Sequence, residues 1–355
     1  MPSGKEERRA DSPVRVAVVG AGVFGRNHLR VYRELESTGQ RVELAAVVDP
    51  DADACARASQ EYGVRAFSSI EECMEDGHAT GMRIDAASVC VPTIEHARIA
   101  QALMACGVDL LIEKPIAGSL SEADAIVRSA RELGRIVQSG HLERFNPAVR
   151  AVRGLLNQPM FFEVHRLSVF TPRSLDVDVV LDLMIHDLDI VLSLVGSPVR
   201  EVRAVGLPVL SRKVDIANVR LEFQNGCIAN FTASRVSTER VRKMRFFQPH
   251  QYLSLDFARQ DLLLIDVTAA AGLDVAQLAA MSGSGGHPSA GMSLRKVPVE
   301  PGEPLRLELE AFLDAVRRRT EPEVTAEEGR AALALALEIN AAAAAHAKRT
   351  GLISH

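Results

Sequence analysis

The sequence places an aspartate and a histidine in a setting that suits removal of a proton from a hydroxyl group, and a lysine at a strand end where open α/β folds bind ligands. Lys114 stands in the tripeptide Glu113-Lys114-Pro115, directly after the strand expected at Asp109–Ile112. Asp182 and His186 are four residues apart in a stretch of helical character, so both are expected on one helix face. A carboxylate beside an imidazole orients the ring and stabilises its protonated form, as a general base requires. The alternative for Lys114 is an ordinary solvated lysine. Asp182 and His186 could instead form a surface ion pair or part of a metal site.

A second cluster has the pattern of a dinucleotide-binding turn. The apolar run Val14–Val19 leads into Gly20-Ala21-Gly22-Val23-Phe24-Gly25, and a helical pattern begins at once. In such a turn the first glycine permits the bend, the second admits a pyrophosphate and the third allows close helix packing. The next apolar run, Val42–Val48, ends at Asp49, where a carboxylate would accept the ribose hydroxyls of NAD and repel the 2′-phosphate of NADP. A simple glycine turn with an ordinary aspartate is the alternative to an NAD site.

Polar residues after further expected strands complete the candidate site. Pro92-Thr93 and His96 follow the strand expected at 86–91, where they either cover the cofactor or start the next helix. Gly140–Pro147 follows the strand expected at 136–139, and a helix cap explains Asn146 but not its polar neighbours. The residues expected at the cofactor are Gly20, Gly22, Val23, Phe24, Gly25, Asp49, Val91, Pro92, Thr93, His96, Glu113 and Lys114. Those expected at the substrate are Lys114, His141, Glu143, Arg144, Asn146, Asp182, His186, Arg235 and Arg242.

The elements that must position these residues fall into two classes. Short apolar strands alternate with amphipathic helices up to about residue 140, which predicts a parallel sheet with helices on both faces. Beyond Arg144 the strands follow one another without intervening helices, which predicts an α+β domain with an open, mostly antiparallel sheet. We therefore expect a disordered leader (1–12), an NAD-binding Rossmann domain (13–144) and an α+β substrate and oligomerisation domain (145–355). The terminal helix, which starts at a capping box of Thr325 and Glu328, could pack back on the Rossmann domain.

Two stretches of the second domain predict its surface. Asn225-Gly226 predicts a two-residue hairpin in which Phe223 faces Ile228. In this register Val219, Leu221, Phe223 and Ile228 pack against helices, while Arg220, Glu222, Ala229 and Phe231 face solvent or another subunit. Such an open sheet suits a homo-oligomer, either a dimer or a tetramer. Ala269–Gly302, rich in small residues, is expected to be a long mobile excursion.

Composition narrows the classes of function. The 355 residues are 47% hydrophobic and 25% charged with a net charge of −5, and aromatic residues make up 4% with no tryptophan, which disfavours nucleic-acid binding. No run approaches the roughly 18 apolar residues of a membrane span, and the polar start of the chain does not resemble a signal peptide. The five cysteines form no C-x-x-C pair, so we expect reduced thiols, a cytoplasmic location and no zinc or other metal site. Cys90 and Cys106 are expected in the core.

Together these elements resemble the Gfo/Idh/MocA family of NAD(P)-dependent sugar oxidoreductases. The resemblance is carried by Gly20–Gly25 with His28, by Glu113-Lys114-Pro115 and by Asp182 with His186. It implies that Lys114, Asp182 and His186 form the catalytic set. His186 would be the general base, Lys114 would hold or help to deprotonate the reacting hydroxyl, and Asp182 would position both. The resemblance leaves open whether Lys114 or His186 takes the proton.

A narrower resemblance concerns the substrate. His141–Val149, Asp182–Ile190 and Arg235–Phe247 are similar to the nucleotide-sugar branch of the family. This implies oxidation of the C3 hydroxyl of a UDP-N-acetylglucosamine-type sugar to a ketone, which a partner aminotransferase then aminates in lipid A precursor synthesis. The cations Arg235, Arg240, Arg242, Lys243 and Arg245 could bind the diphosphate, or could form a solvated strand edge.

Other functions remain alternatives to this reading. Met184 stands where the family pattern usually has a glycine, which could reshape the substrate pocket. Dehydrogenation of a free sugar or inositol is one alternative. A non-catalytic NAD-dependent sensor is another, although a sensor would not need Lys114, Asp182 and His186 together.

Overall fold

The computed structural model describes residues 12–170, 177–268, 272–273, 277 and 293–351. The chain divides into two compact units, residues 1–141 with 305–333 and residues 142–304 with 334–355. The boundary thus falls after His141 rather than after Arg144. The leader expected at residues 1–12 lies outside the described residues except for Ser12.

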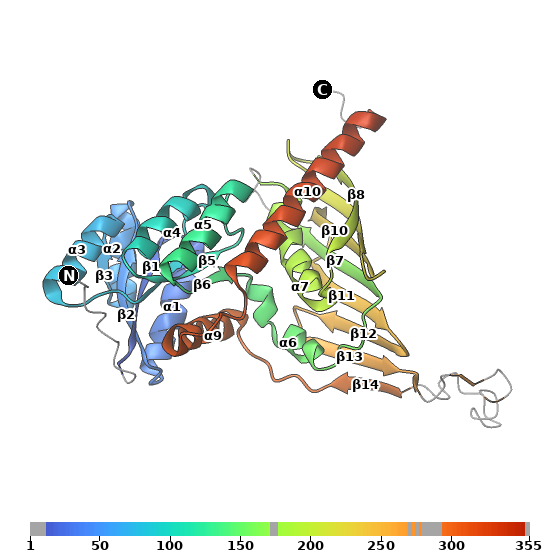
Figure 1. Cartoon of the computed structure of the whole chain (residues 1–355), viewed down its shortest axis with the longest axis horizontal. Coiled ribbons are helices and arrows are strands. Elements are labelled where there is room, and N and C mark those ends of the chain that lie inside the picture. Colours follow the sequence, from blue (N-terminus) through green and yellow to red (C-terminus); the bar gives the residue numbers. More distant parts are fainter. Residues whose placement is uncertain (1–11, 171–176, 269–271, 274–276, 278–292, 352–355) are drawn as a thin grey trace. The chain divides into compact units, whose positions relative to one another are not determined.

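The first unit is built on a parallel sheet of six strands in the order β3-β2-β1-β4-β5-β6 (Figure 1). Every residue of β4, β5 and β6 is buried, so this part of the sheet is covered on both faces. The strands are β1 (Val14–Val19), β2 (Val42–Val48), β3 (Arg65–Phe67), β4 (Ala86–Val89), β5 (Asp109–Glu113) and β6 (Val137–Gly140). The helices between them are α1 (Val23–Ser37), α2 (Ala52–Tyr62), α3 (Ile70–Thr80), η1 (Thr93–Glu95), α4 (His96–Ala105) and α5 (Leu120–Leu133). The expectation of a Rossmann-type α/β sheet is confirmed.

Side chains at the helix ends explain where several of these helices begin. The Asp51 carboxylate accepts hydrogen bonds from the N–H groups of Asp53 at 2.9 Å and Ala54 at 3.2 Å, and so caps α2.

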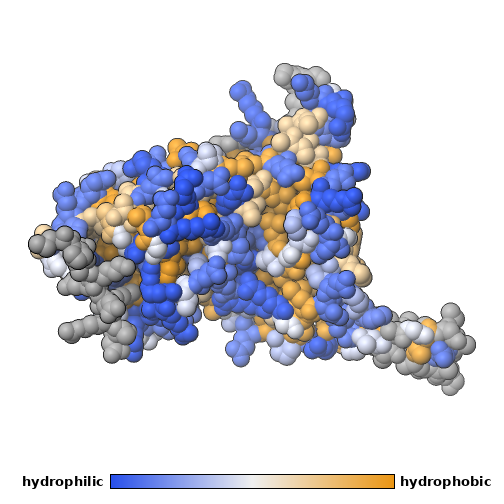
Figure 2. Space-filling view, viewed as in Figure 1, coloured by the Kyte–Doolittle hydropathy of each residue, from blue (hydrophilic) through white to orange (hydrophobic). Residues whose placement is uncertain are grey.

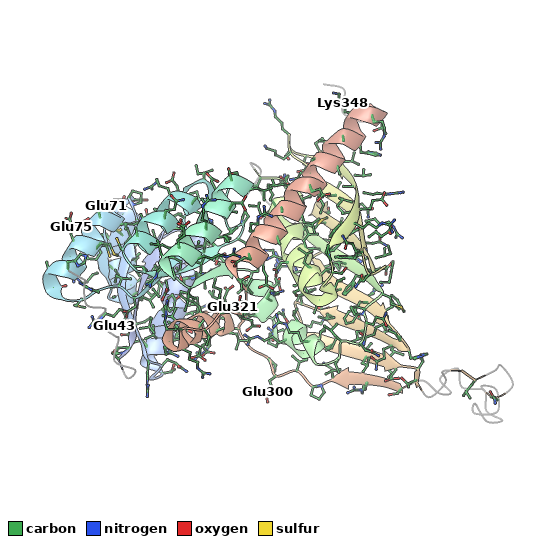
Figure 3. All side chains as sticks on the ribbon, viewed as in Figure 1. Glu43, Glu71, Glu75, Glu300, Glu321 and Lys348 are labelled. Carbon is green, nitrogen blue, oxygen red and sulfur yellow. The ribbon has the colours of Figure 1, made fainter. Side chains whose placement is uncertain are left out.

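In α3 the exposed side chains include Glu71 and Glu75, labelled in Figure 3, whereas Cys73 is buried. The helix therefore has the amphipathic pattern of an element that covers a sheet.

The chain returns to the first unit after its excursion through the second. Helix α9 (Pro304–Arg318) and helix α10 (Ala326–Thr350) form this segment, and α10 begins at the expected capping box, with Glu328 N–H donating to Thr325 at 3.1 Å. The Ser139 N–H of β6 donates to the Val324 carbonyl at 3.0 Å, next to a β-bridge between Gln138 and Thr325. The start of α10 thus lies against the edge strand β6, and the later turns of α10 belong to the second unit.

The second unit contains an eight-stranded sheet in the order β14-β13-β12-β11-β7-β10-β9-β8. The pair β10 and β7 is parallel and the other pairs are antiparallel, so the expectation of a mostly antiparallel sheet is confirmed. The strands are β7 (Phe161–Val169), β8 (Val199–Leu207), β9 (Ile216–Phe223), β10 (Ile228–Ser237), β11 (Val241–Gln248), β12 (Gln251–Asp256), β13 (Asp261–Asp266) and β14 (Ser293–Val297). Its short helices are η2 (Leu142–Phe145), α6 (Pro147–Arg153), η3 (Val180–Met184) and α7 (Ile185–Val195).

The two faces of this sheet differ in burial. Phe162 and Phe246 are fully buried on one face and stack with ring centroids 5.1 Å apart. The opposite face carries Phe161, Phe247 and Tyr252, which contact one another but stay partly exposed. Apolar surface is visible beside the C-terminal half of α10, next to hydrophilic side chains (Figure 2).

The hairpin register differs from the expected one by one residue. Gln224, Asn225 and Gly226 form a three-residue connection in which Phe223 pairs with Cys227, and Gly226 has a φ of +87°. The Asn225 side chain accepts the Cys227 N–H at 3.1 Å, which stabilises this turn. A slip of one residue turns side chains to the other face. Ala229 and Phe231 are therefore buried with Val219, Leu221 and Phe223, whereas Ile228 lies on the face of Glu222.

Three further expectations were wrong. Residues 293–297 form strand β14, so the excursion expected at 269–302 is not irregular throughout, and most of 269–292 lies outside the described residues. The stretch of helical character that carries Asp182 and His186 starts, in its described part, as a π-helix at Val180 and not as a regular α-helix. Cys106 is exposed because it follows α4 as its C-cap, and Cys90 is only half-buried. Among the described residues we find no helix with the length and apolar character needed to cross a membrane.

Candidate active site

The glycine turn of the first unit has the geometry of a dinucleotide-binding loop. Gly20 has a φ of +100°, and a Cβ there would lie 2.7 Å from the Cys90 carbonyl oxygen. A Cβ on Gly25 would lie 1.8 Å from the Gly20 carbonyl oxygen, so this glycine lets α1 approach β1. At Gly22, by contrast, an added Cβ would meet no atom within 4 Å. Two glycines therefore permit the fold, and the third leaves space in front of the loop.

The start of α1 and the end of β2 face this turn. No side chain caps α1 at Gly22, its first turn has no acidic residue, and Val23 is 62% exposed, so its N–H groups and partial positive charge are available to an anion. The Asp49 carboxylate accepts the Ala21 N–H at 2.7 Å and the Asp51 N–H at 2.9 Å. These bonds hold a half-buried carboxylate beside the glycine turn.

His96 joins two loops at the carboxyl edge of the sheet. The residue is 1% exposed, with Nε2 2.9 Å from the Val91 carbonyl oxygen and Nδ1 3.0 Å from the Pro115 carbonyl oxygen. Burial lowers the pKa of His96, although the two carbonyls oppose the shift. The side chain thus fixes the loop that carries Pro92 and Thr93, and it also starts α4.

The Glu113-Lys114-Pro115 tripeptide ends β5 at the same edge. Glu113 is buried, and its Oε1 lies 3.2 Å from Nε2 of His28 on α1. Lys114 is half-buried and is followed by a cis peptide bond to Pro115. The lysine therefore lies at the carboxyl ends of the parallel strands, where open α/β sheets bind ligands.

In the second unit, Asp182 and His186 lie on either side of the change from η3 to α7. The Asp178 carboxylate accepts the Val180 N–H at 2.9 Å and the Leu181 N–H at 3.0 Å, and so starts the π-helical segment. The other Asp178 oxygen accepts from the Asn340 amide of α10 at 3.0 Å. Both Asp182 and His186 are half-buried. A π-helical turn of this kind is frequent at functional sites.

A buried network of ion pairs holds α7 on the sheet. Arg166 of β7 donates two hydrogen bonds of 2.8 Å to Asp187, and a third of 2.9 Å to Glu143. The Arg144 guanidinium lies 3.6 Å from Asp189, and both side chains are 2% exposed. Asp187 and Asp189, the carboxylates that follow His186 on this helix, are therefore partners of arginines. Among the described residues no group of three or more histidines, cysteines and carboxylates could hold a metal ion.

Comparison with known proteins assigns the family. Residues 14–141 match the model described as "Oxidoreductase family, NAD-binding Rossmann fold", and residues 131–248 match the "GFO/IDH/MocA C-terminal domain". A UDP-N-acetylglucosamine 3-dehydrogenase from Acidithiobacillus ferrooxidans is 34% identical over 95% of this chain and 99% of its own. The chain belongs to the Gfo/Idh/MocA family. Its members include NAD-dependent sugar dehydrogenases, and NAD is the cofactor of this one.

Solved structures agree with this family assignment. The structure of UDP-N-acetylglucosamine 3-dehydrogenase GnnA from Acidithiobacillus ferrooxidans has a TM-score of 0.80 at 33% identity, covering 93% of this chain and 97% of that one. Levoglucosan dehydrogenase in complex with NADH and levoglucosan has a TM-score of 0.78 at 16% identity, covering 94% and 98%, which shows a shared fold. A scyllo-inositol 2-dehydrogenase (NAD(+)) from Bacillus subtilis is 28% identical over 63% of this chain and 68% of its own.

The residues at the carboxyl edge of the first unit fit a bound NAD. The space in front of Gly22 and the uncapped start of α1 suit a pyrophosphate, and Asp49 suits ribose hydroxyls. Val23, Phe24 and Thr93 lie around the same edge on partly exposed positions, and Ile94 is 76% exposed. That the predicted cofactor residues contact NAD stays a prediction.

The basic segment of the second unit does not form one patch. On β11 the alternation of a strand places Lys243 and Arg245 on the face opposite Met244 and Phe246, which are buried. Arg242 lies on the buried face, opposite Arg166, with its guanidinium 3.7 Å from Glu143. Burial and then the charge of Arg166 lower the pKa of Arg242, against the opposing effect of Glu143.

Arg235 corrects the predicted substrate set. Its side chain is buried, and it donates to Asp215 at 2.8 Å, to the Val177 carbonyl at 2.7 Å and to Ser211 at 3.1 Å. The guanidinium thus stabilises the connection between β8 and β9. Because it is buried in these bonds, it does not face a site where a diphosphate could bind.

The remaining predicted residues divide between the two units. Lys114 and His141 belong to the first unit, and Glu143, Arg144 and Asn146 belong to the second together with Asp182 and His186. Asn146 caps α6 through the Ala148 N–H at 3.1 Å and donates to the Phe257 carbonyl at 3.0 Å. That Lys114 and His186 meet at one nicotinamide ring stays a prediction.

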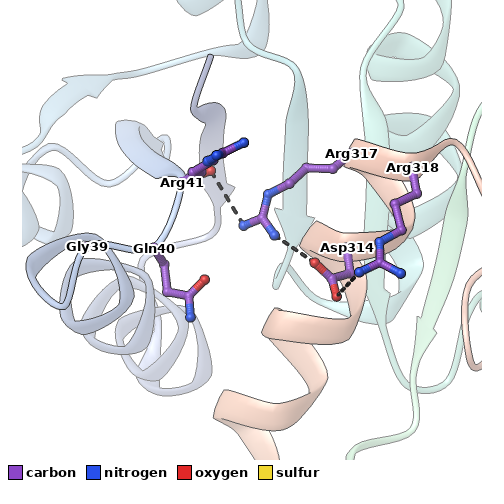
Figure 4. A pocket seen from close by; sticks show the side chains of 6 residues that line it. All are labelled: Gly39, Gln40, Arg41, Asp314, Arg317 and Arg318. Carbon is purple, nitrogen blue, oxygen red and sulfur yellow. Dashed lines mark hydrogen bonds and ion pairs between the residues drawn. The ribbon is translucent and has the colours of Figure 1, made fainter. Parts of the chain in front are cut away.

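A cavity of about 470 Å³ lies elsewhere in the first unit, lined by Gly39, Gln40, Arg41, Asp314, Arg317 and Arg318 (Figure 4). Arg317 donates to Asp314, three residues earlier on α9, at 2.7 Å. Arg41 directly precedes β2, so this cavity lies at the amino ends of the strands. It is therefore separate from the carboxyl edge that carries the candidate cofactor residues.

Sequence reasoning missed the roles of Arg166, Asn340 and the pair of His28 with Glu113. One signal was present for Arg166, because it occupies the same alternating position on β7 as the buried residues Phe162 and Val164. A charged residue at a buried position predicts a buried partner. No comparable signal connects Asn340 to Asp178, since 162 positions of sequence separate them.

Proposed function

We propose that this protein oxidises the C3 hydroxyl of a UDP-N-acetylglucosamine-type sugar to a 3-keto sugar with NAD. The observation that carries the proposal is the 34% identity to a UDP-N-acetylglucosamine 3-dehydrogenase over 95% of the chain. The chain also has the dinucleotide turn, the tripeptide with Lys114 and the Asp182 and His186 pair. This set supports a catalyst over a non-catalytic sensor, because a sensor would need no base.

In this proposal each group of the chain has one task. Lys114 donates a hydrogen bond to the reacting hydroxyl and stabilises the charge that develops on its oxygen. His186 takes the hydroxyl proton at a ring nitrogen, and Asp182 orients the imidazole and stabilises its protonated form. The alternative, in which Lys114 takes the proton, uses the same groups. NAD, when bound, supplies the acceptor for the hydride that leaves the sugar carbon.

The diphosphate contact is assigned to fewer residues than the sequence suggests. Arg242 stays in the proposed substrate set with His141, Glu143, Arg144 and Asn146. Its guanidinium is part of a network in which Arg166 and Glu143 fix neighbouring charges, and arginine suits bidentate phosphate binding. Arg235 is left out because its donors are already bonded.

We also propose that the protein is a homo-oligomer that meets its copies through the partly exposed face of the second sheet. The aromatic contacts of Phe161, Phe247 and Tyr252 on that face support this, since such clusters are enriched in interfaces. Sedimentation velocity of the wild type and of Phe247→Asp tests it, and a monomeric wild type would contradict it.

The cellular setting completes the proposal. A 3-keto sugar is the substrate type of an aminotransferase, so we propose that such an enzyme consumes the product, as in lipid A precursor synthesis. The five free cysteines and the need for NAD and a UDP-sugar support a cytoplasmic location.

A substrate panel tests the function. The protein is incubated with NAD and, separately, UDP-N-acetylglucosamine, other UDP-sugars, free N-acetylglucosamine and inositols, and NADH formation is followed. We expect turnover with UDP-N-acetylglucosamine and a 3-keto product by mass spectrometry and NMR. The matched variant Lys114→Ala should lose kcat by about 10²-fold or more while still binding NADH. Selective turnover of an inositol would favour the alternative that the 28% identical scyllo-inositol 2-dehydrogenase suggests.

A further inference from the structure

A buried histidine with no task in the proposed reaction lies beside the catalytic tripeptide. His28, on α1, is 0% exposed, and its Nε2 is 3.2 Å from Oε1 of Glu113. Glu113 ends β5 and directly precedes Lys114. Phe24, one turn earlier on α1, packs against the imidazole with ring centroids 5.3 Å apart. A buried polar contact therefore joins the helix that starts at the dinucleotide turn to the tripeptide that carries the lysine.

The direction of this hydrogen bond follows from its partners. An ionised glutamate can only accept, so the histidine nitrogen that faces it must carry the hydrogen. Nδ1 of His28 is buried and has no hydrogen-bond partner among the described residues. The arrangement therefore corresponds to the Nε2–H tautomer, which donates to Glu113 and leaves the Nδ1 lone pair buried.

The Glu113 carboxylate is enclosed on other sides as well. Gly140 pairs with Glu113 across β5 and β6, and a Cβ on Gly140 would lie 2.9 Å from Glu113 Oε1. Burial and then the charge of Glu113 raise the pKa of the Cys90 thiol, which lies in the loop after β4. The charge of Glu113 also opposes the lowering of the His96 pKa by burial. On α1 itself, the titratable neighbour of His28 is Tyr32. The carboxylate thus has little freedom to rotate, and the His28 donor selects its orientation.

We propose that His28 is a positioning residue for the dehydrogenase reaction. By donating to Glu113, it fixes the end of β5 and thereby holds Lys114 in place relative to the cofactor turn at the start of α1. The inference rests on the proposed role of Lys114. It assigns to His28 no contact with substrate and no proton transfer.

A neighbouring contact provides the control. Tyr32, one turn further along α1, is also 0% exposed and shares a hydrogen bond of 2.9 Å with Ser88 of β4. This bond is buried and comes from the same helix, but it does not reach the tripeptide. Tyr32→Phe therefore measures the cost of losing a buried hydrogen bond of α1 without disturbing Glu113.

The experiment compares His28→Leu, His28→Gln and Tyr32→Phe in the full chain. In His28→Leu the buried carboxylate loses its donor, and kcat should fall by roughly 10- to 100-fold, which corresponds to about 1.4–2.7 kcal/mol of barrier. KM for NAD should change less than about threefold, because the glycine turn is untouched. His28→Gln places an amide donor near the position of Nε2 and should recover most of kcat. Tyr32→Phe should lower the melting temperature and leave kcat within about twofold of wild type.

Several results would overturn the inference. These are a kcat of His28→Leu within about twofold of wild type, an equal loss in Tyr32→Phe, no recovery in His28→Gln, or a rise in KM for NAD with kcat unchanged. All ratios are measured with whichever sugar the wild type oxidises best, so a wrong substrate leaves the comparison intact. A measurement without turnover is the ¹⁵N NMR spectrum of the His28 ring, which should show the Nε2–H tautomer in the wild type and altered ring shifts in Glu113→Leu. An Nδ1–H tautomer in the wild type would refute the hydrogen bond itself.

Discussion

The buried pair of Arg166 and Asp187 gives a prediction whose magnitude follows from its geometry. Both side chains are almost fully buried, and two hydrogen bonds of 2.8 Å join them. Removing one partner of such a pair leaves an uncompensated buried charge, which costs about 3–5 kcal/mol, whereas replacing both by apolar groups costs much less. Arg166→Met, Asp187→Leu and the double variant test this.

The two single variants should differ in a defined order. Arg166→Met deprives both Asp187 and Glu143 of their donor, so its loss should be near 5 kcal/mol. After Asp187→Leu the guanidinium keeps Glu143 at 2.9 Å and the ring of Phe257 at 5.3 Å, so the loss should be near 3 kcal/mol. The double variant should be more stable than either single variant.

Calorimetry of the full chain is the assay, since two units need not unfold in one step. A change of 1 kcal/mol shifts the melting temperature by roughly 2–4 °C at this size, so Arg166→Met should lower the transition of the second unit by on the order of 10 °C or more. Arg200→Met is the matched control, because Arg200 pairs with Glu222 at 3.1 Å while 70% exposed, and such pairs contribute little. The reasoning is refuted if Arg166→Met behaves like Arg200→Met, or if the double variant loses as much as the two single losses together.

Three further predictions concern the cofactor site and the helix that carries the proposed catalytic pair. Asp49→Arg should raise the kcat/KM for NADP relative to NAD, because it replaces a repelling carboxylate by a cation; an unchanged preference in steady-state kinetics would exclude Asp49 as a determinant. Gly22→Val should weaken NADH binding by at least about tenfold without lowering the melting temperature, since a Cβ at Gly22 would meet no atom within 4 Å. Gly25→Ala should unfold the protein, because its Cβ would strike the Gly20 carbonyl. Calorimetry with NADH titration separates the two variants, and equal effects would count against the site. Asn340→Leu should reduce kcat several-fold with KM for NAD unchanged, because Asp178, which starts the π-helical turn, loses the hydrogen bond from Asn340. The control is Glu338→Ala at an exposed neighbour, and equal kcat values for the two variants would speak against this support.

The first unit could be predicted nearly completely from its sequence, because each of its signals is local. A glycine with a positive φ, a capping aspartate and an apolar run each specify the conformation of a few neighbouring residues. Asp51 caps α2, and Thr325 with Glu328 starts α10, as the sequence predicts. The glycine turn also behaves as its spacing requires, with a tight Gly25 and an open Gly22. Local chemistry therefore determined the cofactor half of the candidate site.

The second unit was predicted less well because its errors depend on single residues and distant contacts. One extra turn residue, Gln224, moved Ile228 to the other face, although both strands were recognised. The basic segment was treated as one patch, but alternation along β11 separates Arg242 from Lys243, and a buried carboxylate at Asp215 engages Arg235. Contacts between distant residues leave no periodic signal in one sequence.

The π-helical turn shows why the proposed catalytic pair, Asp182 and His186, falls in this second class. A spacing of four residues placed Asp182 and His186 on one face of a regular helix, yet Asp182 lies in a segment with wider turns than the α-helix in which His186 lies. Met184, fully buried, occupies the last position of that segment, where the family pattern usually has a glycine. The Met184 side chain must be buried, and the Asp178 carboxylate fixes the start of the segment. The backbone between these two residues therefore forms the wider turns of a π-helix. The direction in which Asp182 projects is therefore determined by packing and by the bond from Asn340 to Asp178, neither of which the spacing of the motif encodes.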